Sequence, residues 1–107
     1  VVHAGSHLVI GDNVHIGHGA VIHCSRIGNN VLIGSKATLL DGAEIGDSCI
    51  IAANSMVSQG MKVPDASFVA GVPAKVKGKV TPSQAARVEE GVKAYMRLAS
   101  EYKQHEL

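Results

Sequence analysis

Histidines are concentrated near the start of this 107-residue chain. Five of the six lie within the first 23 residues, and three of these stand in the stretch VHIGHGAVIHC at residues 14–24. Neutral imidazole is the commonest metal ligand in proteins, and three converging histidines with one open position describe a catalytic zinc site. The alternative for any single histidine is an exposed, solvated side chain. The fold must therefore decide which of them can meet: His3, His7, His15, His18, His23 and His105.

An aliphatic residue recurs every six positions between residues 10 and 69, with a single five-residue step between 22 and 27. Neither a helix nor a simple alternating strand explains this spacing together with the recurrent turn sequences Gly-Asp-Asn, Gly-Asn-Asn and Gly-Asp-Ser. The pattern is typical of a parallel β-helix, an all-β fold with three short faces per coil and an inward aliphatic ladder on each face. The ladder positions are Ile10, Ile16, Ile22, Ile27, Ile33, Leu39, Ile45, Ile51, Val57, Val63 and Val69.

The repeat also predicts which coils stack. Three six-residue steps make about 18 residues per coil, so Ile27, Ile45 and Val63 should stack, as should Ile33 and Ile51. The alternative, a small β-sandwich, is disfavoured because a strict six-residue run of this length has no role in a sandwich.

A C-terminal helix is predicted after the repeat, which stops within AGVPAKVKGKV at residues 70–80. Thr81 as N-cap, Pro82 at the first helical position and Gln84 three residues beyond the cap form a capping-box signature. We expect residues 1–76 to form the β-helix, and residues 77–107 a linker and a helix that packs on its outside. The helix's apolar stripe is Val88, Val92, Tyr95, Ala99 and Tyr102.

Composition excludes several function classes. A formal charge of +1 gives no bias toward nucleic acid or an anionic membrane. Apolar runs fall short of the roughly 18 to 20 residues that span a bilayer, so a cytoplasmic location is the default expectation. Cys24 and Cys49 lack CxxC or CxxH spacing, which predicts buried or half-buried thiols rather than a disulfide or a zinc knuckle.

Spacing limits which histidines can share an ion. His3 and His23 are 20 residues apart, about one coil plus a local excursion, so they can lie on adjacent coils of one face. Five extended residues between His18 and His23 span about 16 Å, and a corner between them turns their side chains apart. A symmetric trimer resolves this if His18 of one chain faces His3 and His23 of its neighbour. On spacing alone, His7 competes with His3.

Three segments carry a family resemblance: VVHA, IGDNVHIGHGAVIHCSRIGNNVLIGSKATLLDGAEIG and GVPAK. Together they resemble the gamma-class carbonic anhydrase family and its hexapeptide relatives of the phenylacetate and carnitine pathways. The resemblance covers residues 1–104, and the G-H-x-x-x-x-H element at residues 17–23 is its most specific part. It implies a homotrimer of left-handed β-helices, each with a C-terminal helix, and a metal between subunits. The implied ligands are His3, His18 and His23, whereas His7 and His15 match no ligand position.

The resemblance also implies a reaction and its participants. Zinc, or iron or cobalt in the same site, would lower the pKa of its bound water to about 7, and this metal-bound water would hydrate carbon dioxide to bicarbonate. No other cofactor is implied. Tyr95 is a candidate for lining the pocket, with a place in the helix's packing stripe as the equal alternative. Family members carry further coils upstream, with an arginine, an aspartate and a glutamine that complete the pocket, and the present sequence starts at Val1 without them.

Three other functions share this coil pattern. A hexapeptide acyltransferase would bind coenzyme A and use a single histidine as general base. An acyl-CoA thioesterase would use the same metal site, and a non-catalytic assembly module would use none of the histidines. The three matched histidines favour the metal enzyme.

Overall fold

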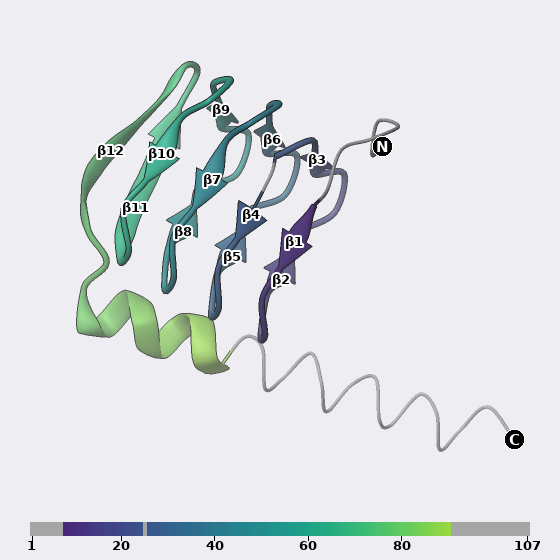
Figure 1. Cartoon of the computed structure of the whole chain (residues 1–107). Coiled ribbons are helices and arrows are strands. Elements are labelled where there is room, and N and C mark those ends of the chain that lie inside the picture. Colours follow the sequence, from purple (N-terminus) through teal and green to yellow (C-terminus); the bar gives the residue numbers. More distant parts are fainter. Residues whose placement is uncertain (1–7, 25, 91–107) are drawn as a thin grey trace, which may run out of the picture.

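Residues 8–24 and 26–90 are described by a computed structural model, in which short strands wind into a solenoid of stacked coils (Figure 1). Each of the first three coils contributes one strand to each of three sheets, and strands of successive coils pair in parallel. The first sheet contains β1 (Val9–Ile10), β4 (Arg26–Ile27), β7 (Glu44–Ile45) and β10 (Lys62–Val63). The second contains β2 (His15–Ile16), β5 (Leu32–Ile33), β8 (Ile50–Ile51), β11 (Ser67–Gly71) and β12 (Ala74–Lys79). The third contains β3 (Val21–Ile22), β6 (Thr38–Leu39) and β9 (Met56–Val57).

The predicted aliphatic ladders form the core. Ile27 pairs in register with Ile45, and Ile45 with Val63, while Ile33 pairs with Ile51. Exposure of these five side chains is 4% or less. The parallel β-helix and its stacking are therefore confirmed, and the hydrophobic stabilisation comes from columns of aliphatic side chains.

The corner between the first and second sheets explains the recurring Gly-Asp-Asn type of sequence. The Oδ1 atom of Asn29 accepts a hydrogen bond from the backbone N–H of Asp12 at 2.8 Å, and Asp47 and Asp65 repeat this contact one coil further on. A Cβ atom on Gly28 would lie 2.3 Å from Oδ1 of Asp47. Glycine precedes the polar residue because the next coil approaches too closely for any side chain.

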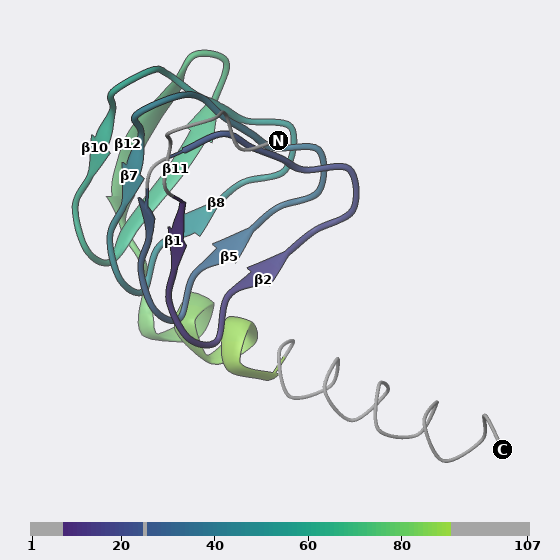
Figure 2. The same ribbon diagram turned by 45° about the vertical axis from the view of Figure 1, so that its right-hand side comes forward.

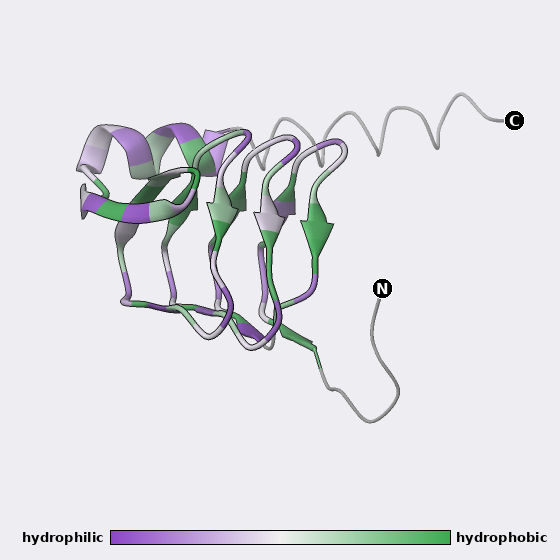
Figure 3. Cartoon of the chain, turned by 90° about the horizontal axis from the view of Figure 1, so that it is seen from above, coloured by the Kyte–Doolittle hydropathy of each residue, from purple (hydrophilic) through white to green (hydrophobic). Residues whose placement is uncertain are grey.

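The first coil leaves apolar side chains uncovered among the described residues. Val9, Ile10, Ile16 and Val21 are 59%, 45%, 41% and 47% exposed, although Ile10 and Ile16 occupy the inward ladder. Their strands lie at the edges of the three sheets. In Figure 3 the strand nearest this end of the solenoid is coloured as hydrophobic throughout.

The solenoid ends in a hairpin and a helix. Strand β12 pairs antiparallel with β11 and continues to Lys79, which is beyond the predicted end of the β-helix at residue 76. The division of the chain into residues 1–76 and 77–107 stays a prediction. The capping box is confirmed: Thr81 N–H donates to Oε1 of Gln84 at 2.8 Å, and Gln84 N–H donates to Oγ1 of Thr81 at 3.1 Å.

Helix 82–90 runs beside the corner that joins the first and second sheets (Figures 1 and 2). The remaining members of its predicted stripe, from Val92 to Tyr102, lie outside the described residues. In the described part of the chain, no helix is long and apolar enough to cross a membrane.

Candidate functional site

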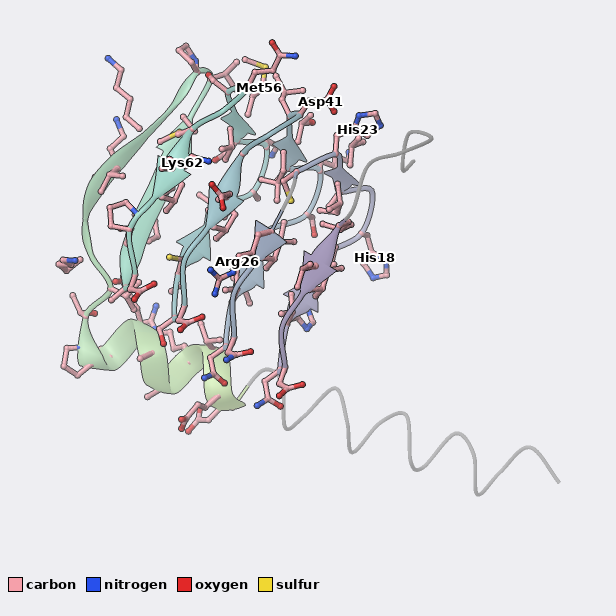
Figure 4. The ribbon with its side chains drawn as sticks, viewed as in Figure 1. His18, His23, Arg26, Asp41, Met56 and Lys62 are labelled. Carbon is pink, nitrogen blue, oxygen red and sulfur yellow. The ribbon has the colours of Figure 1, made fainter. Side chains whose placement is uncertain are left out.

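His18 and His23 flank strand β3 at two different corners of the first coil. His18 is exposed, and its backbone carbonyl accepts a hydrogen bond from the N–H of Lys36 at 2.8 Å. His23 follows β3, and its backbone N–H donates to the carbonyl of Leu39 at 2.8 Å. Figure 4 shows the two side chains at separate positions along the outside of the solenoid. The structure of one chain therefore does not bring these two candidate ligands together.

His23 is the more constrained of the two histidines. Its Nδ1 atom lies 3.0 Å from Oδ1 of Asp41, which stands 18 residues further on in the next coil (Figure 4). The His23 side chain is 24% exposed and that of Asp41 is 51% exposed. The contact joins side chains of two successive coils, and both side chains remain accessible from outside.

The remaining sequence-predicted site residues are placed as follows. His15 faces outward from β2 and is half-buried, in register with Leu32 of the next coil. The candidates His3 and His7 at the start of the chain, and Tyr95 and His105 near its end, lie outside the described residues. Within residues 8–24 and 26–90, no three His, Cys, Asp or Glu side chains gather in a group that could hold a metal ion.

Asp41 was not among the candidates that the sequence predicted. Its signal was nevertheless present, because a residue one coil length after His23 must lie near it on the next coil. The contact spans 18 residues, the same separation as the Asn29–Asp47 and Asp47–Asp65 contacts. Searching for polar residues one coil length from each histidine would have found it.

The outward face of the first sheet carries charges rather than candidate ligands. Arg26 pairs in register with Glu44, and Glu44 with Lys62. The ammonium group of Lys62 donates to Oε2 of Glu44. These side chains are solvent-accessible, so the pair contributes little to stability.

The two cysteines are buried free thiols, as the sequence predicts. Burial raises the pKa of both Cys24 and Cys49 above the ordinary value for a thiol. The Sγ–H group of Cys49 donates to the carbonyl of Pro64 at 3.1 Å. Since the thiolate is the reactive and metal-binding form, burial disfavours a nucleophilic or metal-binding role for both cysteines.

Comparison with known proteins gives matches to hexapeptide-repeat proteins of two activities. Residues 24–59 match the family described as bacterial transferase hexapeptide (six repeats). The chain is 50% identical over 101 residues to a Methanocaldococcus jannaschii protein named "Probable carbonic anhydrase", covering 92% of this chain and 64% of that protein. It is 37% identical over 91 residues to gamma carbonic anhydrase 2, mitochondrial, of Arabidopsis thaliana, covering 85% of this chain and 33% of that protein.

Among solved structures, a Bacillus cereus protein provisionally described as an acetyltransferase matches with a TM-score of 0.84 and 32% identity, over 92% of this chain and 63% of that one. A serine acetyltransferase of Brucella abortus matches with a TM-score of 0.59 and 29% identity, over 73% of this chain and 41% of that one. The chain thus spans less than two thirds of the length of these relatives. The highest sequence identity among these four is to the Methanocaldococcus jannaschii protein.

Proposed function

Because the chain belongs to the gamma carbonic anhydrase family of hexapeptide-repeat proteins, we propose that it catalyses the reversible, metal-dependent hydration of carbon dioxide to bicarbonate. The observation that carries the proposal is the 50% identity over 101 residues to the Methanocaldococcus protein. The proposed ligands are His3, His18 and His23, contributed by two subunits of a homotrimer.

The described residues fit a metal site of this kind. His18 and His23 both lie on the outside of the coil, where a neighbouring chain can reach them. The carboxylate beside Nδ1 of His23 is the usual companion of a metal-ligating histidine. Within a single chain the imidazoles of His18 and His23 lie at different corners. The proposal therefore requires His18 to come from a second chain. A closed ring of three chains repeats that contact at every interface.

The chemistry needs little else from the chain. When bound, a divalent cation such as zinc supplies a Lewis acid that makes water nucleophilic near pH 7, and iron or cobalt can serve in the same ligand set. The three proposed histidine ligands would hold the ion in their neutral form. Val21, which is 47% exposed on the strand between the two corners, offers an apolar surface for an uncharged substrate such as carbon dioxide.

The direct test is metal content together with hydration activity. The chain, purified without an affinity tag and loaded with zinc, is expected to hold about one ion per subunit, because a closed trimer has as many interfaces as chains. Stopped-flow measurement with a pH indicator should show faster carbon dioxide hydration, which a chelator abolishes. A chain that binds no zinc and does not accelerate hydration would overturn the proposal.

Mixed assembly tests whether each site is shared between subunits. His18→Ala and His23→Ala chains are each expected to be inactive alone. In trimers refolded from an equal mixture, about a quarter of the interfaces should unite an intact His18 with an intact His23 from different chains. Hydration activity should return to about that fraction of the wild type. If each site lay within one chain, mixing would restore nothing.

A second candidate function is acyl transfer. The Bacillus cereus match and the His23–Asp41 pair favour it, since a carboxylate-oriented histidine also suits a general base. Acetyl transfer from acetyl-CoA by metal-free protein, unaffected by a chelator, would identify this activity. Loss of acyl transfer on chelation would instead indicate the metal site.

A further inference from the structure

We infer that Asp41 is a positioning residue, which holds His23 in the tautomer that presents Nε2 to a metal ion. This inference rests on the proposed function and assigns a role to a residue outside the three ligands. Its basis is the 3.0 Å contact between Oδ1 of Asp41 and Nδ1 of His23.

The chemistry of the two groups fixes the direction of this hydrogen bond. An ionised carboxylate only accepts hydrogen bonds, so Nδ1 of the neutral imidazole must carry the proton and donate it. The lone pair of the ring then lies on Nε2, the nitrogen on the opposite side from Asp41. A carboxylate in this position also raises the basicity of the ligand nitrogen.

The backbone of two separate coils fixes the geometry of the pair. His23 is held by its N–H donating to the carbonyl of Leu39. The corner that carries Asp41 is held by two contacts from the following coil: Gly60 N–H donates to the carbonyl of Asp41, and Leu40 N–H donates to that of Val57, each at 3.0 Å. Gly42, with φ of +75°, completes the turn. The pair is therefore preorganised by the solenoid rather than assembled around the ion.

His18 and His23 differ in whether a side chain of the same chain hydrogen-bonds to the imidazole ring. No side chain in the described part of the chain hydrogen-bonds to the imidazole of His18. Only the ring of His23 has a carboxylate from its own chain among the described residues. Substituting Asp41 should therefore affect His23 selectively and leave His18 unchanged.

The test uses Asp41→Asn in the full chain, with Asp12→Asn as the matched control. Asp12→Asn makes the same charge change at a corner of the first coil, away from the second-coil corner that carries Asp41. An asparagine amide can either donate or accept, so it no longer enforces one tautomer. In the metal-free protein near pH 8, ¹⁵N NMR of the imidazoles should show His23 mainly as the Nδ1–H tautomer. Asp41→Asn should shift it toward Nε2–H, whereas Asp12→Asn should not.

Zinc affinity provides the second measurement. Removal of a partner of this kind weakens metal binding by about 10- to 100-fold, and we expect that loss for Asp41→Asn and none for Asp12→Asn. Asp41→Glu, which keeps the carboxylate, should recover part of the affinity, and it replaces the asparagine variant in the test if that variant does not fold.

An unchanged His23 tautomer in Asp41→Asn would overturn the inference while leaving the proposed function intact. A wild-type chain that binds no zinc would overturn the proposed function, and the tautomer measurement would still decide the role of Asp41.

Discussion

Replacing His18 by alanine is expected to reduce bound zinc from about one ion per chain to almost none, and to abolish carbon dioxide hydration. His18 is one of only three proposed protein ligands, and its loss leaves two imidazoles from a single neighbouring chain. Losing a hydrogen-bond partner of a ligand already weakens binding by about 10- to 100-fold, so losing the ligand itself should cost more. Metal analysis after dialysis, with a zinc-binding titration, measures the effect.

The matched control is His15→Ala, in the same coil. His15 faces outward from β2 and matches no ligand position, so its removal should leave the metal content unchanged. The fold should tolerate His18→Ala, because the one hydrogen bond that His18 makes within the described residues uses its backbone carbonyl, which alanine retains. An unchanged thermal unfolding curve would confirm this. Full zinc occupancy in the His18→Ala protein would remove His18 from the site.

The ladders could be predicted from the sequence because each inward position meets the same restriction in every coil. An inward side chain has neighbours directly above and below, so only an aliphatic residue satisfies both, and one six-residue period reports the whole column. Ile45 illustrates this, since it lies between Ile27 and Val63 and is 1% exposed. The capping box at Thr81 and Gln84 could also be predicted from the sequence, because its two hydrogen bonds depend only on the local spacing of these residues.

The site was less predictable because outward residues follow no such repeat. The His23–Asp41 contact joins two outward side chains, and hydrophobic periodicity carries no information about them. The grouping of ligands from different chains is not encoded in any single-chain pattern either. It came from the resemblance to a family. The β11–β12 hairpin was missed for a related reason, since its antiparallel pairing abandons the six-residue period that identified the other strands.

One aliphatic column allows the stabilisation by the solenoid core to be measured at a buried position and at an exposed position. Ile45→Ala is expected to lower the free energy of unfolding by about 2–5 kcal/mol, because it leaves a cavity between two buried neighbours. Ile10→Ala, at the end of the same column, should cost about 1 kcal/mol, because an isoleucine worth about 1.5–3 kcal/mol when fully buried is here 45% exposed. Urea unfolding of the two variants beside the wild type measures both values.

The comparison also tests whether the first coil is covered in the assembled protein. Ile10 and Ile45 lie in the same column and are both isoleucine, but they differ in how far neighbouring atoms bury them. The ratio of the two losses in unfolding free energy therefore reports the difference in burial. A clearly smaller loss for Ile10→Ala is the expected result, because Ile10 is 45% exposed and Ile45 is 1% exposed. Equal losses would contradict it, because they would require a second layer of atoms over Ile10, and the apolar edge formed by Val9, Ile10, Ile16 and Val21 would then be an interface.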